Sequence, residues 1–171
     1  SQLEEIKIIG NNYTRNDIIL REIQHPIPGE YDSTLALEDR NRIYNLGLFS
    51  TVEIEQVNSS YTIFIVETFR YFPIPIVDFN EAKGWSYGGG IVFLNFRGMN
   101  EKLTIGGIIG EETTYFLDFR DPWIAGDHVS LSGSVYQFYT KNPVYSYYYK
   151  ERGLNIGTGF YKNEFHKIKI Q

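Results

Sequence analysis

The chain has 171 residues, of which 42% are hydrophobic, so it is long enough for one or two domains with buried cores. Its formal net charge of −5 argues against a nucleic-acid partner, because the phosphate backbone selects basic surfaces. The lack of cysteine excludes a disulfide framework and a thiolate site, and no run of 18 apolar residues predicts a transmembrane helix.

The first 70 residues form one compositional unit that predicts a strand, two helices and two further strands. Gly10-Asn11-Asn12 is a turn after the first strand, and Asn58-Ser59-Ser60 is a turn between the last two. Thr14-Arg15-Asn16-Asp17 is similar to a capping box and predicts a helix start, while Gly47 predicts the end of the second helix. The five elements are expected at residues 6–9, 14–23, 33–47, 51–57 and 61–67.

Three short stretches stand out within this β-α-α-β-β order. They are Ile8-Ile9-Gly10-Asn11 with Thr14, Arg21-Glu22-Ile23, and Tyr44-Asn45-Leu46-Gly47-Leu48-Phe49-Ser50 with Val52. Together they resemble a POTRA domain, the polypeptide-transport-associated module. The resemblance implies a periplasmic domain whose strand after the second helix lies at the sheet edge and accepts an extended client by strand addition. The residues of that strand are Thr51, Val52, Glu53, Ile54, Glu55, Gln56 and Val57.

Residues 71–83 are predicted to be a stiff connector between this unit and the rest of the chain. Pro73 and Pro75 fix φ and lack a backbone N–H. The segment is therefore expected to be extended without forming a central strand.

The remaining residues, 84–171, alternate with a period of two, which predicts strands rather than helices. Four antiparallel strands are expected. An ordinary strand has about 5–6 residues, and a strand that crosses a membrane needs about 9–11. Each predicted strand is long enough to cross. The strands are predicted at residues 84–96, 103–120, 128–140 and 153–165, with a tyrosine-rich loop at 141–152.

The alternation also divides the side chains of these strands between two faces. One face is mainly apolar and would contact lipid, whereas the other is small or polar and would face a barrel lumen. Aromatic residues make up 16% of the chain, which suits the aromatic girdles of a membrane barrel and also an ordinary all-β fold. The lipid-facing set is predicted as Leu103, Ile105, Leu117, Val129, Leu131, Leu154 and Ile156, and the lumen-facing set as Ser130, Ser132 and Gly157.

Four motifs in this region carry a second resemblance. They are Gly84-Trp85-Ser86-Tyr87-Gly88-Gly89, Asn95-Phe96-Arg97-Gly98 with Asn100-Glu101, Gly110, and Asp121-Pro122-Trp123. They resemble the first strands of an Omp85-type outer-membrane barrel of the bacterial surface antigen, or D15, family. A POTRA domain directly before such a barrel is that superfamily's arrangement. The expected fold class is thus an α+β POTRA domain followed by antiparallel transmembrane β-barrel strands that form an incomplete barrel.

Family barrels contain many more strands than the four predicted, and their arginine-bearing loop motif has no counterpart in this chain. An open edge in lipid would leave unpaired backbone groups that cost several kcal/mol each. The missing strands are therefore expected either from a longer protein, of which the chain would be a piece, or from other chains.

The first barrel strand is predicted to be a seam at which the barrel opens, because its glycines weaken pairing and packing. A strand leaving the periplasmic side would place residues 97–101 and 145–149 outside. Trp85 and Trp123 would then lie at the same membrane interface, where indole rings are favoured. The seam residues are Gly84, Trp85, Gly88, Gly89, Gly90 and Phe93.

No catalytic, cofactor or metal site is predicted, and the chain is interpreted as a protein without enzymatic activity. His25, His128 and His166 lack the spacing of metal ligands and are interpreted as surface or turn residues. Glu111 and Glu112 are adjacent, so in a strand their side chains would face opposite ways and could not act as a pair.

The resemblance implies a component of outer-membrane protein assembly or translocation. Its partners would be unfolded outer-membrane polypeptide clients, outer-membrane lipid, and accessory assembly proteins or further barrel strands. Two alternatives stay open. One is a POTRA-barrel secretion transporter dedicated to one passenger, and the other is a soluble all-β binding module.

Overall fold

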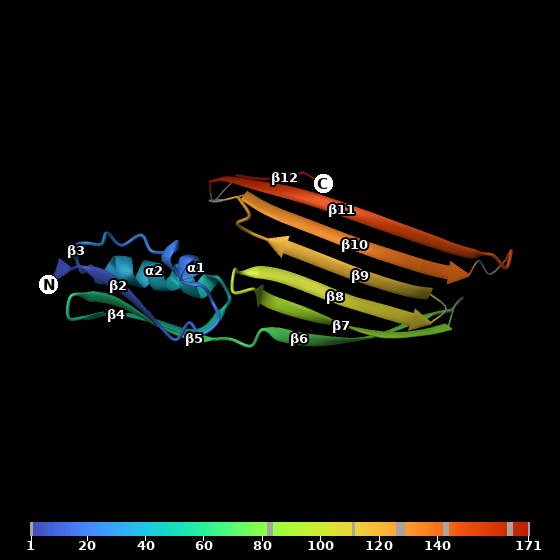
Figure 1. Ribbon diagram of the computed structural model, residues 1–171, viewed down its shortest axis with the longest axis horizontal. Helices are drawn as coiled ribbons and strands as arrows, with labels where there is room; N and C mark the ends of the chain where they lie inside the picture. Colours follow the sequence, from blue (N-terminus) through green and yellow to red (C-terminus); the bar gives the residue numbers. More distant parts are fainter. Residues whose placement is uncertain are drawn as a thin grey trace. The chain divides into compact units, whose positions relative to one another are not determined.

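The computed structural model describes residues 2–81, 84–110, 112–125, 129–141, 144–163 and 166–170, with side chains up to residue 160. The chain forms two compact units (Figure 1). Unit 1 comprises Ser1–Phe69 and Arg97–Asn100, and unit 2 comprises Arg70–Phe96 and Glu101–Gln171. No helix within the described ranges is long and apolar enough to cross a membrane.

Unit 1 contains a three-stranded sheet and two helices, in the chain order predicted from the sequence. The central strand of the sheet is β5, which pairs with the parallel strand β2 on one side and the antiparallel strand β4 on the other. A pair of two-residue strands, β1 and β3, adds to the predicted elements. The elements are β1 (Gln2–Leu3), β2 (Glu5–Ile9), α1 (Asn16–Leu20), β3 (Gly29–Glu30), α2 (Ser33–Asn45), β4 (Phe49–Val57) and β5 (Ser60–Glu67).

The core of unit 1 brings the apolar side chains of α2 together with those of the sheet. Ile43 of α2, Val52 of β4 and Ile63 of β5 are fully shielded from solvent. Burying one such side chain contributes about 1.5–3 kcal/mol. Burial of these side chains therefore holds α2 against the sheet.

The ends of the two helices differ in how well the sequence predicted them. α2 begins after Asp32, whose carboxylate accepts from the backbone N–H groups of Thr34 and Leu35, and Gly47 follows the helix with φ +70°. The predicted capping box of α1 is wrong. The Thr14 hydroxyl donates to Glu67, 2.6 Å away, so a long-range carboxylate holds the side chain that local sequence assigned to the helix cap.

A buried polar cluster in unit 1 centres on Asp39 of α2, which is fully shielded from solvent. Its carboxylate accepts from the backbone N–H of Gln24 (2.9 Å) and of His25 (3.2 Å) and from the Tyr61 hydroxyl (2.9 Å), and it forms an ion pair with Arg42. These donors replace the water that the charge loses on burial.

His25 belongs to the same cluster, so its interpretation as a surface residue is wrong, although it does lie in a bend between α1 and β3. The residue is 4% exposed, and its ring lies against those of Tyr31 and Tyr61. Its Nε2 accepts from the Asp32 N–H at 2.9 Å. His128 and the side chain of His166 lie outside the described residues.

The buried hydroxyl of Tyr61 predicts a loss of stability at alkaline pH. Burial, and then the hydrogen bond to and charge of Asp39, raise the pKa of Tyr61. Above about pH 10 the unfolded chain releases this proton while the folded unit retains it, so the stabilisation present below that pH is lost as pH rises. Denaturant unfolding of unit 1, measured across that range, should show the loss in the native chain and less of it in Tyr61→Phe. The half-exposed Tyr44→Phe is the control, and equal alkaline losses in the two variants would contradict the assignment.

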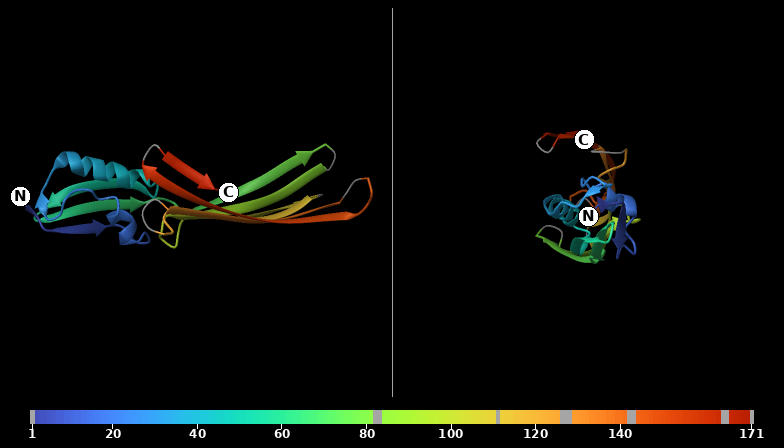
Figure 2. Two further views of the ribbon diagram at one scale, coloured as in Figure 1. Left: turned by 90° about the horizontal axis from the view of Figure 1, so that it is seen from above. Right: turned by 90° about the vertical axis from the view of Figure 1, so that its left-hand side faces the viewer.

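Unit 2 is one antiparallel sheet in which successive strands of the chain are neighbours. Figure 1 shows this order from β6 in green to β12 in red, and Figure 2 shows that the sheet is curled. Among the described residues, β6 and β12 are its terminal strands. The strands are β6 (Tyr71–Asn80), β7 (Gly84–Phe96), β8 (Glu101–Gly110), β9 (Glu112–Asp121), β10 (Val129–Lys141), β11 (Tyr148–Asn163) and β12 (His166–Ile170).

The predicted connector at residues 71–83 is instead the first strand of this sheet. β6 pairs with β7 along its whole length, from Tyr71 opposite Phe93 to Asn80 opposite Gly84. The prolines that argued against a central strand are compatible with a terminal one, because a terminal strand needs N–H donors on one side only. Residues 82 and 83 lie outside the described ranges.

The predicted strand at residues 103–120 is a hairpin of two strands, β8 and β9. Ile105 pairs with Leu117, Gly107 with Tyr115 and Ile108 with Thr114, so the chain reverses after Ile108. Alternation continues with the same phase on both sides of the turn, which is why a period-two pattern did not reveal it. Residues 148–152, predicted as loop, begin β11. The described sheet consequently has seven strands instead of four.

The register places each turn at one of two ends of the sheet. We call the end at which β6 begins with Tyr71 the proximal end, and the opposite end, with Asn80 and Gly84, the distal end. The turn after Phe96 is therefore proximal, and its prediction as an external turn is wrong. The extra strand β6 accounts for this reversal.

The two tryptophans lie at opposite ends of the sheet, so the prediction that they share one interface is also wrong. Trp85 pairs with Phe79 at the distal end, whereas Trp123 follows β9 at the proximal end. The added strand β6 and the added turn between β8 and β9 each reverse the direction of the strands that follow, so after residue 112 the two changes cancel. Trp123 and Tyr145 are consequently at the ends of the sheet predicted for them.

Candidate functional site

The first candidate site is the free side of β4, which pairs only with β5 in the described sheet. A two-residue turn joins the strands, so the flanking residues Val57 and Ser60 exchange hydrogen bonds. Alternation from this pair directs the backbone groups of Glu53 and Glu55 toward β5 and those of Ile54 outward. The predicted segment of residues 51–57 is therefore an edge strand. Only its even-numbered residues direct their backbone N–H and C=O groups toward the side on which a new strand could pair.

Arg40 of α2 partly covers this edge, a feature that the sequence did not predict. Its Nε donates to the outward carbonyl of Val52 at 2.9 Å. A groove of about 150 Å³ runs beside it between the helix and the strand. The groove is lined by Tyr31, Ser33, Ala36, Leu37, Arg40 and Ile54.

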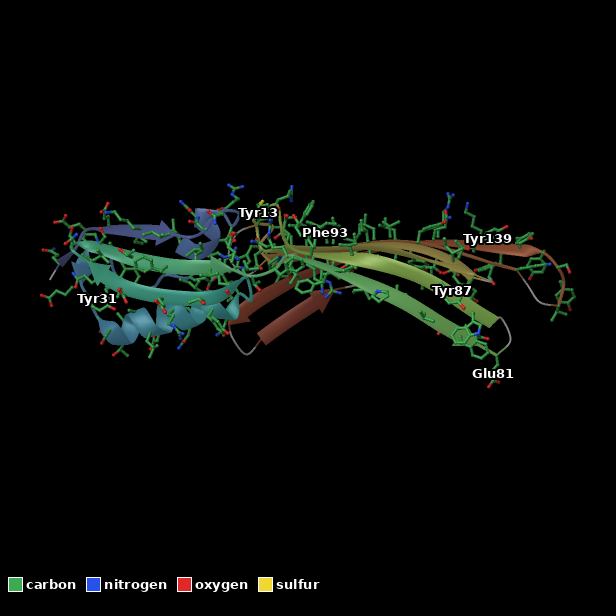
Figure 3. All side chains as sticks on the ribbon, turned by 90° about the horizontal axis from the view of Figure 1, so that it is seen from below. Tyr13, Tyr31, Glu81, Tyr87, Phe93 and Tyr139 are labelled. Atoms are coloured by element: carbon green, nitrogen blue, oxygen red, sulfur yellow. The ribbon has the colours of Figure 1, made fainter. Side chains whose placement is uncertain are left out.

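The second candidate site is the apolar face of the unit 2 sheet. Cross-strand pairing aligns Ile91, Ile105, Leu117, Val135 and Leu154 in one row across five strands. These side chains are between 37% and 66% exposed. The predicted lipid-facing residues fall on this face, and Figure 3 labels Phe93, Tyr87 and Tyr139 from it.

The opposite face is mainly small or polar, as predicted, with apolar exceptions that include Val92, Ile108 and Phe116. The next row along the strands aligns Val92, Thr104, Asp118, Ser134 and Asn155. The Asn155 amide donates to Ser134, and the hydroxyls of the predicted lumen residues Ser130 and Ser132 donate to the carbonyls of Gly159 and Gly157. The sheet is thus two-faced across its width.

The predicted seam strand, β7, is not a terminal strand of this sheet. It carries Gly84, Trp85, Gly88, Gly89, Gly90 and Phe93 between β6 and β8. A Cβ at Gly88 would lie 2.1 Å from the Gly107 carbonyl oxygen, so the neighbouring backbone leaves no room for a side chain there. Among the described strands, the edge on this side of the sheet belongs to β6.

Aromatic side chains gather at the distal end of β6 and β7. The rings of Phe79 and Trp85 are 4.9 Å apart, and Trp85 stacks on Tyr87 at 6.1 Å. Near the proximal end, the backbone N–H of Trp123 donates to the Asp121 carboxylate at 2.8 Å. Within the described residues no group of His, Cys, Asp and Glu could hold a metal ion.

Most of the sheet is similar to a known domain. Residues 95–170 match the Omp85 superfamily domain. That part of the chain is thus similar to the Omp85 superfamily. A curated relative, the outer membrane protein assembly factor BamA of Neisseria meningitidis serogroup B, is 26% identical over 142 residues. The match covers 78% of this chain and 18% of the relative.

Solved structures support the fold of this chain. BamA from Haemophilus ducreyi lacking POTRA domains 1–3 superposes with a TM-score of 0.76 at 23% identity, covering 96% of this chain and 33% of that one. CdiB from Acinetobacter baumannii superposes with a TM-score of 0.55 at 14% identity and covers 96% and 34%. This chain therefore spans about a third of the length of these structures.

The sequence predicted the faces of the strands but missed the terminal strand. The signal for β6 was available in two prolines spaced two apart, followed by the alternation of residues 77–80. Prolines at that spacing point the same way from an extended chain, which is typical of an edge. The cap that Arg40 forms on β4 had no local signal, because it depends on helix and strand meeting in space.

Proposed function

We propose that this chain is part of an outer-membrane protein that inserts or translocates client polypeptides by strand addition. The observation that carries the proposal is the two-faced sheet, which exposes an apolar row across five strands. A soluble all-β module would cover such a row with a second layer, whereas a membrane barrel presents it to lipid. The sheet is then one arc of a larger barrel that further strands complete.

We further propose that unit 1 is a POTRA domain in the periplasm. Its element order and its free strand β4 support this assignment. Strand addition at β4 would supply main-chain hydrogen bonds to an extended client, with the groove beside α2 accepting its side chains. Clients would be unfolded outer-membrane polypeptides, with accessory assembly proteins as further partners.

Proline at Ile54 should weaken client binding at β4 without unfolding the sheet. It removes an outward N–H, worth about 0.5–1.5 kcal/mol, so crosslinking of a client should fall about two- to tenfold. Ile54→Ala is the matched control, because it removes the same side chain and keeps the donor. The measurement is photo-crosslinking from Glu53, an exposed position on β4, to an in vitro translated outer-membrane polypeptide.

An odd-numbered residue of β4, whose backbone faces β5, supplies a second control. Glu55→Pro removes a donor to β5, so it should destabilise unit 1 itself. Client crosslinking that is equal in Ile54→Pro and Ile54→Ala, with both proteins folded, would show that clients do not add to this edge.

A transporter dedicated to a single passenger is the second candidate, favoured by the likeness to CdiB. That likeness is weaker than the likeness to BamA. The TM-scores are 0.55 for CdiB from Acinetobacter baumannii and 0.54 for CdiB from Escherichia coli, against 0.76 for BamA. Depleting the full-length protein from cells separates the two functions. Loss of many outer-membrane proteins would support general assembly, and loss of a single secreted one would support the dedicated transporter.

A further inference from the structure

The terminal strand β6 alternates between residues that face β7 and residues that face away. The Leu94 N–H donates to the Arg70 carbonyl at 2.8 Å, and the register of β6 and β7 continues from this pair without a shift. Alternation then directs the backbone of the even residues toward β7. The backbone groups of Pro73, Pro75, Val77 and Phe79 therefore point to the free edge.

The two prolines remove consecutive donors from this edge. Pro73 and Pro75 present carbonyls only, and their rings occupy the space in which a partner strand would place its own carbonyls. Val77 and Phe79 present both an N–H and a carbonyl. The distal part of the edge therefore has both backbone donors and acceptors for a partner strand, whereas the proximal part lacks the donors at Pro73 and Pro75.

The side chains differ between the same two parts. At residues 77–80 the apolar Val77 and Phe79 alternate with Asp78 and Asn80, and Val77 and Phe79 are 62% and 54% exposed. Residues 72–76 read Phe-Pro-Ile-Pro-Ile and are apolar on both faces. A client strand with alternating apolar and polar residues, the pattern of transmembrane barrel strands, matches only the distal part.

We propose that strand addition at the free edge of β6 is confined to residues 77–80, and that Pro73 and Pro75 exclude a client strand from the proximal part. The inference rests on the proposed function and adds to it which part of the edge a client occupies. A client would be held by its backbone at the distal end while its other end stays unpaired beside the prolines.

Disulfide crosslinking tests this directly, because the chain has no native cysteine. Ile74→Cys reports on the proximal part and Asp78→Cys on the distal part. Both positions would form closely spaced, non-hydrogen-bonded pairs with an added antiparallel strand. The probe is a synthetic peptide with the sequence of β10, Val129–Lys141, carrying one cysteine and added to the whole chain in lipid vesicles.

We expect the peptide to crosslink about tenfold more to Asp78→Cys than to Ile74→Cys. Restoring the donors with Pro73→Val and Pro75→Val together should raise the Ile74→Cys yield toward that of Asp78→Cys. In the converse variant, Val77→Pro should lower the Asp78→Cys yield by a similar factor, whereas the control Val77→Ala should not.

Two other outcomes are distinguishable. Equal yields at both cysteines in the native background, or a proximal yield unchanged by restoring both donors, would overturn the confinement while leaving strand addition in place. No crosslink at either position, even with both valines, would overturn strand addition at β6 and the inference with it.

Discussion

Replacing Asp39 with alanine is expected to cost unit 1 about 3–5 kcal/mol of unfolding free energy. The carboxylate is fully buried and is the common acceptor for two backbone N–H groups and the Tyr61 hydroxyl. Alanine would leave these donors without a partner and would remove the charge that balances Arg42. Each donor left unsatisfied adds to the cost, so the loss should exceed that of an ordinary core truncation.

The matched control for this change is Glu38→Ala on the same helix. Glu38 lies 3.7 Å from Arg42 but its side chain is 56% exposed, so its removal should cost about 0–1 kcal/mol. Hydrogen exchange of peptides from unit 1 in the whole chain would report both values. A similar loss for the two variants would mean that burial at Asp39 does not govern the stability of the unit.

The second large effect is expected on the apolar face of unit 2. In a bilayer, arginine at Ile105 should cost about 2–4 kcal/mol if the position lies near the midplane, and less toward either end. Ile105 lies within the apolar row, paired with Ile91 on one side and Leu117 on the other. No polar side chain occurs in that row from Ile91 to Leu154 to accept the guanidinium.

Thr104→Arg is the control, because residue 104 is next in the chain and lies in the polar row beside Asp118. It should be tolerated within about 1 kcal/mol, since a lumen-facing charge keeps its hydration. Folding into lipid vesicles, titrated with urea, measures the difference. If Thr104→Arg were the more damaging substitution, the assignment of faces would be reversed.

The element order of unit 1 and the two faces of unit 2 could be predicted because both depend on local spacing. Ala36, Asp39 and Ile43, spaced three and four apart, are the buried residues of α2, and Asp32 and Gly47 are at its ends. The capping box at Thr14 failed although its local pattern was plausible. Glu67, 53 residues away, accepts the hydroxyl that would otherwise cap α1.

The positions of the free edges could be predicted only in part. The edge at residues 51–57 followed from a resemblance, and its pairing with β5 alone agrees with it. The seam was assigned to β7 because its glycines suggested weak pairing, yet β7 has a partner on each side. A sequence pattern describes how a strand alternates but does not count the neighbours that it acquires.

The sequence by itself determined which side chains share a face, because alternation is a property of the extended chain and survives any number of turns. Ile105 and Leu117 were assigned to one face even though a turn divides their predicted strand. Only the tertiary structure decided the number of strands, the end at which each tryptophan lies, and which backbone groups are left outward on β6. Those features depend on pairing between distant segments, and a period of two contains no information on where a strand reverses or what lies beside it.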